Sequence, residues 1–503
     1  MPHLVWSVLH IWIFIWKNKY GDNMNSKSIW NMETEIPRRK PLNKKIKADV
    51  CVVGGGMAGV LTAYKLQENG FDVVVLEARS VASGQTGNTT AKLTIQQGEK
   101  YTKLIETLGE TKARLYAKAN SDAIDDFERI IKEKNINCDF QRVPSYLYSL
   151  EEDNNIIKEY ESAKKIGINC YTTDLTHLPF KVKTALVFRN QAQFNPLKFL
   201  SKITEEIKIY ENSPVREIKS NLVETESGVV QANHIVIATH YPIVNKKGLF
   251  FPRLYQSRSY ALAVEGGVTL DGMYFTEDRE GLSFRNYKNY TIIVGEGHNT
   301  GDNPNGDKYK RLRNKVMQIL PNSREIAHWS AQDTKSIDGL PYIGKYCVTE
   351  NAWYTATGFG KWGMTLSMVS ANLITALITG RENPYEKLFT PLRFKSSSAD
   401  NLCKMGGKAI KEIAKEFFSP PKDELDEIEK GQAKVVSYNG EKVGAYRDEN
   451  GQVHMVSIMC THMGCQLQWN GDEKSWDCPC HGSRFSYKGE LIDNPAQNNL
   501  NSV

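Results

Sequence analysis

Apolar and polar positions follow a clear pattern near the start of the chain. Residues 48–57 read as a short buried strand that runs into a glycine turn, and a helical pattern over Ala58–Glu68 stops at Asn69-Gly70. A second apolar run, Phe71–Leu76, closes on Glu77. Because strand, helix and strand follow one another directly, this segment predicts a βαβ unit of a parallel sheet.

The middle of the chain changes periodicity twice. Residues 100–135 carry apolar positions at helical spacing, whereas short β-branched and aromatic runs dominate between 140 and 300, with a helix near 197–206. A long helical pattern over 361–379 ends at Gly380. These patterns predict an α/β domain with an interleaved mixed β-sheet region.

The pattern changes again after residue 390. A polar linker contains a lysine-rich amphipathic helix at about 404–418, which Pro420-Pro421 ends. From Ala433 onward, short strands alternate with turns such as Asn439-Gly440. The predicted parts are an N-terminal extension at 1–47, an α/β domain at 48–390, a linker at 391–432 and an all-β domain at 433–503.

Length, charge and cysteine content narrow the possible classes. A chain of 503 residues exceeds what one hydrophobic core usually serves. The net charge of +6 is small for this length and the lysines are scattered, so we expect no nucleic-acid partner. Nine cysteines are too few for a disulfide scaffold, but four of them fall within 21 residues and need a local explanation: Cys460, Cys465, Cys478 and Cys480.

The N-terminal apolar run, Leu4 to Trp16, is shorter than the roughly 20 residues that a membrane-spanning helix needs. It also lacks the basic start and the cleavage site of a signal peptide. Two interpretations remain: a peripheral segment that packs on the protein or touches a membrane, or a translated stretch upstream of a true start at Met24. We expect no stable membrane span and a cytoplasmic location.

Residues Gly54 to Gly59 fit the pattern G-x-G-x-x-G between the first strand and its helix. Gly54 permits the tight turn, Gly56 lets the backbone approach a pyrophosphate, and Gly59 lets helix and strand pack closely. The helix N-terminus would hold the pyrophosphate. Glu77, 18 residues after Gly59, is placed to accept hydrogen bonds from a ribose. The segment therefore predicts a dinucleotide site.

Two short motifs near the end of the chain form the strongest signal. Cys460-Thr461-His462 is followed, after fifteen intervening residues, by Cys478-Pro479-Cys480-His481. Each loop offers one thiolate and one imidazole, and Rieske-type [2Fe–2S] clusters bind one iron by two thiolates and the other by two imidazoles. Zinc also accepts two cysteines and two histidines. The glycines beside the loops favour the cluster, with Cys460, His462, Cys478 and His481 as ligands.

The dinucleotide segment resembles the D-amino-acid-oxidase-like flavoprotein superfamily. The resemblance runs from Asp49 to Thr90, with Leu-Glu-Ala-Arg at 76–79, and recurs at Ser213–Arg216, Ile235–Thr239, Asp338–Gly344 and Thr357–Thr365. It implies an FAD cofactor and a Rossmann-like FAD-binding fold. The implied FAD contacts are Gly54, Gly56, Met57, Ala58, Gly59, Glu77, Ala78, Arg79, Gly84, Thr86, Val215, Ala238, Thr239, Gly358, Gly360, Gly363, Met364 and Thr365.

We expect FAD to be bound without a covalent link, because residues 83–98 contain neither histidine nor cysteine. His240 and Cys347 keep a covalent link open. The glycine-rich turn at 358–363 would direct N–H groups toward the flavin pyrimidine edge, where negative charge accumulates on reduction. The alternative is that these glycines only begin the helix that follows and have no contact with the flavin.

The cluster loops resemble those of Rieske proteins of the cytochrome bc type. That resemblance implies a disulfide between Cys465 and Cys480, with two free thiols as the alternative. Ser483 matches the serine that donates a hydrogen bond to the cluster in the high-potential members. The tyrosine donor of those members is replaced here by Phe485, so one donor is missing.

The combined order resembles bacterial FAD-dependent oxidoreductases with a fused Rieske domain. It implies an enzyme that oxidises an amine or amino acid and passes electrons through the cluster to a protein or quinone acceptor. A non-catalytic relay or redox sensor is the alternative, and the direction of electron flow stays open. A Rieske oxygenase is nearly excluded, because only 22 residues follow His481.

Candidate substrate contacts are few. Arg253, Arg258 and Arg285 are candidates for holding a carboxylate, or else surface ion pairs. Lys361 and Trp362 lie where the last long helix meets the flavin, so they are expected to face the substrate. The predicted catalytic set is Lys361, Trp362 and Arg285.

Overall fold

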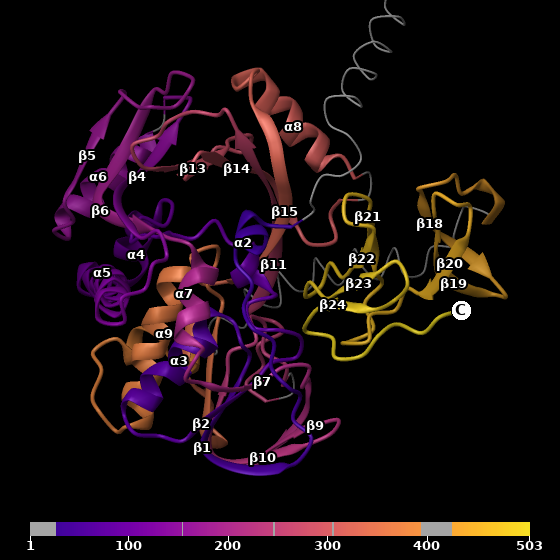
Figure 1. Cartoon of the computed structure of the whole chain (residues 1–503). Coiled ribbons are helices and arrows are strands. Elements are labelled where there is room, and N and C mark those ends of the chain that lie inside the picture. Colours follow the sequence, from indigo (N-terminus) through magenta and orange to yellow (C-terminus); the bar gives the residue numbers. More distant parts are fainter. Residues whose placement is uncertain (1–26, 153, 245–246, 304–305, 394–424) are drawn as a thin grey trace, which may run out of the picture.

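The computed structural model describes residues 27–503 except 153, 245–246, 304–305 and 394–424 (Figure 1). The apolar run Leu4–Trp16, the start at Met24 and the predicted helix at 404–418 lie outside the described residues. Within the described part of the chain, no helix is long and apolar enough to cross a membrane.

The first sheet has eight strands and contains the predicted βαβ unit. Its strands are β1 (Lys45–Val53), β2 (Val73–Leu76), β7 (Lys208–Tyr210), β8 (Val215–Lys219), β9 (Leu222–Thr225), β10 (Val229–Ile237), β16 (Tyr342–Cys347) and β17 (Glu350–Thr357). The order is β16-β17-β10-β1-β2-β7, with β9 beside β10 and β8 beside β9. β1 is central and pairs in parallel with β10 and β2, as buried apolar runs of this kind require.

The helices of this domain pack on the first sheet, on the second sheet or on one another. They are α2 (Ile29–Glu33), α3 (Met57–Glu68), α4 (Lys100–Leu108), α5 (Glu110–Glu133), α6 (Asn154–Lys165), α7 (Pro196–Ile203), α8 (Lys308–Ile319), α9 (Gly363–Ile378) and α10 (Glu386–Phe389). α3 packs against α9, and α9 against α5. The continuous pattern at 100–135 is two helices, because Gly109 has φ +83° between them and ends the first.

The second sheet has nine strands. They are β3 (Lys92–Leu93), β4 (Gln141–Ser149), β5 (Cys170–Thr173), β6 (Thr184–Gln193), β11 (Leu254–Glu265), β12 (Met273–Phe275), β13 (Ser283–Tyr287), β14 (Tyr290–Asn299) and β15 (Arg324–Ser336). The order is β15-β11-β14-β13-β12-β4-β6-β3, with β5 beside β6. This mixed sheet is the predicted interleaved region. Its edge strand β15 and the neighbouring β11 lie on the side that faces the C-terminal domain (Figure 1).

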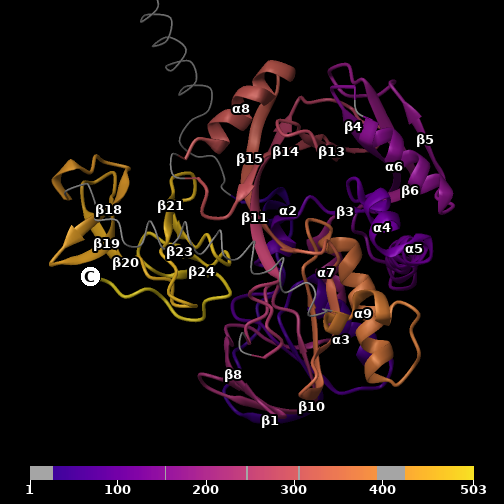
Figure 2. The same ribbon diagram turned by 180° about the vertical axis from the view of Figure 1, so that it is seen from behind.

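The C-terminal domain consists of two small antiparallel sheets. One holds β18 (Ala433–Tyr438), β19 (Glu441–Arg447) and β20 (Val453–Ser457), and the other β21 (Gln468–Asn470), β22 (Ser475–Asp477), β23 (Arg484–Ser486) and β24 (Leu491–Asp493). Figures 1 and 2 both place the second of these sheets between β11 and the first. The all-β prediction for this domain is confirmed, and its second sheet lies against the larger domain.

Candidate flavin site and metal centre

A cavity of about 430 Å³ lies where β1, β2 and β10 end. This is the edge at which open α/β sheets bind their ligands. The predicted cofactor residues that line it are Gly54, Gly56, Met57, Ala58, Glu77, Ala78, Arg79, Gly84, Thr86, Val215, Ala238, Thr239, Gly360, Gly363 and Met364. The tertiary structure thus brings together segments far apart in the sequence.

Close backbone approaches explain two glycines of the motif. Gly54 has φ +112°, and a Cβ there would lie 2.4 Å from the carbonyl oxygen of Ala238. A Cβ at Gly59 would lie 1.9 Å from the carbonyl oxygen of Gly54. Gly59 does not line the cavity; it lets α3 pack against the turn.

Glu77 lies on the cavity wall, and its carboxylate is engaged with the surrounding backbone. One oxygen accepts the N–H of Gly55 at 2.7 Å and the other the N–H of Arg79 at 2.9 Å. Burial raises the pKa of Glu77, while these two backbone bonds oppose the rise. The side chain therefore braces the glycine turn as well as facing the cavity.

Three other predicted residues stand outside the cavity lining. Gly358 lies beside Leu254, Thr365 accepts the N–H of Thr94 at 3.0 Å, and Trp362 packs edge-on against Phe275. Lys361, in contrast, lines the cavity with φ +77°. Its ammonium donates to Ser259 at 3.2 Å.

The three candidate arginines are buried and bound to protein groups. Arg285 donates to the carbonyl oxygens of Thr90 at 2.6 Å and Ala91 at 2.8 Å. Arg253 donates to Pro391 at 2.8 Å. Arg258 lies at the contact with the C-terminal domain, as described below. A buried guanidinium needs acceptors, and here the protein supplies them.

No motif in the sequence marks Lys92, whose ammonium is buried near the charges of Arg285 and Lys361. Burial, and then the charges of Arg285 and Lys361, lower its pKa to about 7. It donates to the carbonyl oxygen of Tyr274 at 3.3 Å. A lysine at the start of a two-residue strand has no motif around it, so only the fold identifies it.

The four candidate metal ligands lie on two loops that face each other. Each loop closes on a glycine whose N–H bonds back to a cysteine carbonyl: Gly464 to Cys460 and Gly482 to Cys478, both at 2.9 Å. Both glycines have positive φ, +75° and +81°. The turns need this conformation, which glycine adopts without strain.

The two histidine rings lie at right angles with centroids 4.9 Å apart. Both ring nitrogens of His462 and Nδ1 of His481 are buried and have no hydrogen-bond partner among the described residues. Burial lowers the pKa of each imidazole to about 4, so both are neutral at pH 7. Neutral, unpartnered imidazoles are what metal ligation requires.

The thiols of Cys460 and Cys478 interact so that one of the two ionises more easily than the other. The pKa of Cys460 is lowered to about 7, first by a hydrogen bond with Cys478 and then, against burial, by the N–H of His462 and the hydroxyl of Ser483. The same pairing raises the pKa of Cys478. The loops therefore present two adjacent sulfurs and two neutral imidazoles.

Comparison with known proteins identifies both the larger domain and the C-terminal domain. A model of the family described as FAD dependent oxidoreductase matches residues 49–377, and one described as Rieske [2Fe-2S] domain matches residues 420–503. The chain belongs to the FAD-dependent oxidoreductase family. It carries a Rieske domain as well, and it binds FAD and a [2Fe–2S] cluster.

Relatives share this architecture or its first part. YhfW of Bacillus subtilis (strain 168), assigned as a Rieske 2Fe-2S iron-sulfur protein, is 36% identical over 94% of this chain and 97% of its own. Gamma-glutamylputrescine oxidoreductase of Escherichia coli (strain K12) is 22% identical over 67% and 85%. The structure of L-proline dehydrogenase from P. horikoshii has a TM-score of 0.59 at 18% identity, over 70% and 98%.

The environment of the cluster loops fits a Rieske centre. Cys465 and Cys480 form a disulfide that joins the loops, and their sulfurs and that of Cys478 lie within 4.8 Å of one another. Phe485 is fully buried in the domain core. Tyr487 packs against Tyr446 and His454 instead, at centroid distances of 4.9 and 5.0 Å.

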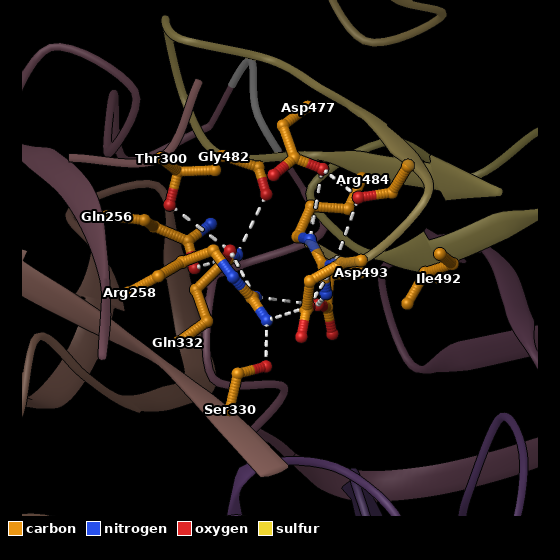
Figure 3. Close-up of polar contacts among 12 residues, drawn as sticks. Gln256, Arg258, Thr300, Ser330, Gln332, Asp477, Gly482, Arg484, Ile492 and Asp493 are labelled. Atoms are coloured by element: carbon orange, nitrogen blue, oxygen red, sulfur yellow. Dashed lines mark hydrogen bonds and ion pairs between the residues drawn. The ribbon is translucent and has the colours of Figure 1, made fainter. Parts of the chain in front are cut away.

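A buried ion-pair network joins the Rieske domain to the FAD-dependent domain (Figure 3). Arg258 of β11 pairs with Glu473 and lies 3.9 Å from Asp493. Arg484 of β23 pairs with Glu473 at 2.5 Å and with Asp477 and Asp493 at 3.1 Å. Burial opposes charge on Glu473 and Asp493, but the arginines outweigh it and hold both pKa values below their usual range.

Two glutamines of the larger domain contact the ligand loop directly. Gln256 donates to the carbonyl oxygen of His481 at 2.6 Å, and Gln332 to that of Gly482 at 2.8 Å. A Cβ at Gly482 would lie 2.7 Å from Gln256. The loop that carries His481 is thus seated closely on the FAD-dependent domain.

The Rieske domain also forms part of the FAD cavity. Arg79 donates to the carbonyl oxygen of Ile492 at 2.9 Å, and Gln497 donates to that of Ile243 at 2.8 Å. The cavity residues that the Rieske domain contributes are Leu491, Ile492, Asp493, Asn494, Ala496, Gln497 and Asn499. The sequence offered no signal for this shared wall, because nothing in the loop marks its partner.

Proposed function

We propose that this protein dehydrogenates an amine or amino acid and passes the electrons through its Rieske cluster to a one-electron acceptor, a protein or a quinone. Bound FAD supplies hydride acceptance from the substrate carbon, and the bound cluster supplies one-electron transfer. The observation that carries the proposal is the FAD cavity, whose wall comes from both domains.

The substrate class is supported by the relatives' names. One names gamma-glutamylputrescine and another L-proline, an amine and an amino acid. Lys361, which lines the cavity, is proposed to face the substrate, with Trp362 holding that turn against Phe275. We propose that Arg285 holds the backbone at Thr90 and Ala91 in place by donating hydrogen bonds to their carbonyl oxygens.

The cavity-lining residues named above are proposed to hold FAD without a covalent bond. Met57 begins α3 and lines the cavity with Gly56, and a Cβ at Gly56 would lie only 3.2 Å from the hydroxyl of Thr86, so a side chain there would crowd the cavity wall. The ligands proposed for the cluster are Cys460, His462, Cys478 and His481. Acid precipitation that leaves the flavin on the protein would contradict non-covalent binding.

The experiment that tests the proposed function mixes the loaded protein with amines and amino acids without oxygen. Flavin absorbance should fall with a substrate, and the EPR signal of the reduced cluster should then rise. Cys460→Ser, which removes one proposed cluster ligand, should still lose flavin absorbance but give no EPR signal. If no amine or amino acid reduces the flavin, the protein is a relay or sensor instead.

A further inference from the structure

One short segment of the FAD-dependent domain touches both cofactor sites. Thr239 and His240 follow β10 and line the FAD cavity. Tyr241, the next residue, lies against the cluster histidines: its ring centroid is 6.5 Å from that of His462 and 6.4 Å from that of His481. Because consecutive Cα atoms are about 3.8 Å apart, a single peptide unit separates the cavity wall from the ring at the cluster.

The ring of Tyr241 is completely buried and meets both imidazoles edge to face, at interplanar angles of 76° and 72°. Its hydroxyl has no hydrogen-bond partner among the described residues. A buried unpaired hydroxyl is costly, and a phenylalanine would avoid that cost. The ring itself packs between the FAD-dependent domain and the two cluster histidines.

The backbone holds this segment in a strained conformation. His240 has φ +65°, and the N–H of Tyr241 bonds to the carbonyl oxygen of Thr239 at 2.7 Å, which makes a γ-turn. Such a non-glycine residue persists only where its surroundings impose it, and observed strain of this kind is a reason to look for function.

Asn494 of the Rieske domain supplies part of that constraint. Its side-chain amide donates to the carbonyl oxygens of both Thr239 and Tyr241, each at 2.8 Å. Asn494 also lines the FAD cavity. One side chain therefore fixes the turn, the cavity wall and the docking of the cluster domain together.

We propose that the segment Thr239–Tyr241 is the route by which electrons pass between flavin and cluster, with Tyr241 as the contact to the ligand histidines. The proposal rests on the proposed function, which requires this transfer. In the step, one electron leaves the reduced flavin and one iron of the oxidised cluster goes from ferric to ferrous. A flavin proton leaves to water, and no bond between heavy atoms changes. The second electron follows after the one-electron acceptor has reoxidised the cluster.

The test introduces electrons at the flavin of the full-length, doubly loaded protein by a laser flash, with EDTA as sacrificial donor. Absorbance of reduced flavin and rapid-freeze EPR of the cluster give the transfer rate. Tyr241→Leu should slow transfer by roughly tenfold or more, which is about 1.4 kcal/mol in the barrier. Tyr241→Phe, which keeps the ring, should retain the wild-type rate.

Phe251→Leu is the matched control. Phe251 also lies beside His481, at a centroid distance of 6.1 Å, but its chain neighbours do not line the FAD cavity, as His240 does beside Tyr241. This variant should transfer electrons at the wild-type rate. Direct reduction of the cluster by dithionite should be unchanged in every variant, because that route does not use Tyr241. Tyr241→Met, which keeps side-chain bulk without a ring, replaces Tyr241→Leu if that variant loses flavin or iron.

The possible outcomes separate the route from the function. Wild-type transfer with a slow Tyr241→Leu and a normal Phe251→Leu supports the route. Wild-type transfer with an unaffected, fully loaded Tyr241→Leu or Tyr241→Met overturns the route and leaves the proposed function standing. Absence of flavin-to-cluster transfer in the wild-type protein overturns both.

Discussion

The guanidinium of Arg258 and the carboxylate of Glu473 form an ion pair that joins the two domains, and their side chains are only 2% and 15% exposed. Arg484 pairs with the same carboxylate from within the Rieske domain. A buried pair of this kind is strongly destabilised when one member is removed, because the other charge stays behind. The pair therefore links domain docking to the FAD cavity that both domains line.

Arg258→Leu should lower the free energy of unfolding by about 3 kcal/mol and weaken FAD retention. The reason is that Glu473 and Asp493 lose a cation in a buried site. Thermal unfolding and flavin content after gel filtration measure the two effects. Arg324→Leu, which removes an arginine that is 66% exposed from its pair with the exposed carboxylate of Glu265, is the control. Equal, small effects of both substitutions would contradict a docking role for Arg258.

Acid should undo the same contact. The pKa values of Glu473 and Asp493 are lowered in the folded protein, so their stabilisation is complete above the usual carboxyl pKa of about 4. As pH falls below that value toward the lowered pKa values, protonation removes it. Flavin release is measured from about pH 6 down to about pH 3. It should begin at a higher pH in Arg258→Leu than in the wild-type protein. Identical release curves would argue against this linkage.

The purified protein should contain about two iron atoms per chain together with flavin, as the paired loops of a Rieske centre require. The unpartnered nitrogens of His462 and His481 give this prediction its structural basis. Metal analysis, visible absorption and EPR measure it. Tetrahedral zinc in place of iron would refute the assignment of the metal.

Glu77→Ala should weaken FAD binding by roughly tenfold, about 1.4 kcal/mol. The substitution leaves the N–H groups of Gly55 and Arg79 without their acceptor and removes the predicted ribose contact. Equilibrium dialysis of flavin measures the change. Glu211→Ala is a matched control, because that carboxylate also accepts backbone N–H groups, from Val81 and Arg39, but does not line the cavity. Similar losses in both would mean that Glu77 acts through loop structure alone.

Phe485→Tyr should raise the midpoint potential of the cluster. A hydrogen bond to a cluster sulfur stabilises the added electron, and Ser483 lies beside Cys460 while Phe485 offers no donor. Redox titration followed by EPR measures the shift. Tyr487→Phe is the control, since Tyr487 packs on Tyr446 and His454. If Phe485→Tyr leaves the potential unmoved while Tyr487→Phe lowers it, the assignment of the missing donor to position 485 is wrong.

The sequence alone determined the features that depend on neighbours along the chain. A glycine motif between strand and helix, and two cysteine–histidine loops at fixed spacing, are local patterns whose geometry follows from a few residues. Those patterns predicted a dinucleotide site, the [2Fe–2S] cluster, the α/β domain and the all-β domain. The resemblance to the D-amino-acid-oxidase-like superfamily then implied that the dinucleotide is FAD. The break at Gly109 was missed, because helical spacing of apolar residues continues across it.

Only the tertiary structure decided how the two domains meet. Arg258 was a candidate for binding a substrate carboxylate, and it pairs with Glu473, a residue 215 positions later. Tyr241 packs against two histidines that it precedes by more than two hundred residues, and Asn494 binds the turn that contains it. Such contacts come from side chains brought together by packing over long separations, and no periodicity or motif in a single sequence encodes which distant residue will fill the other side of an interface.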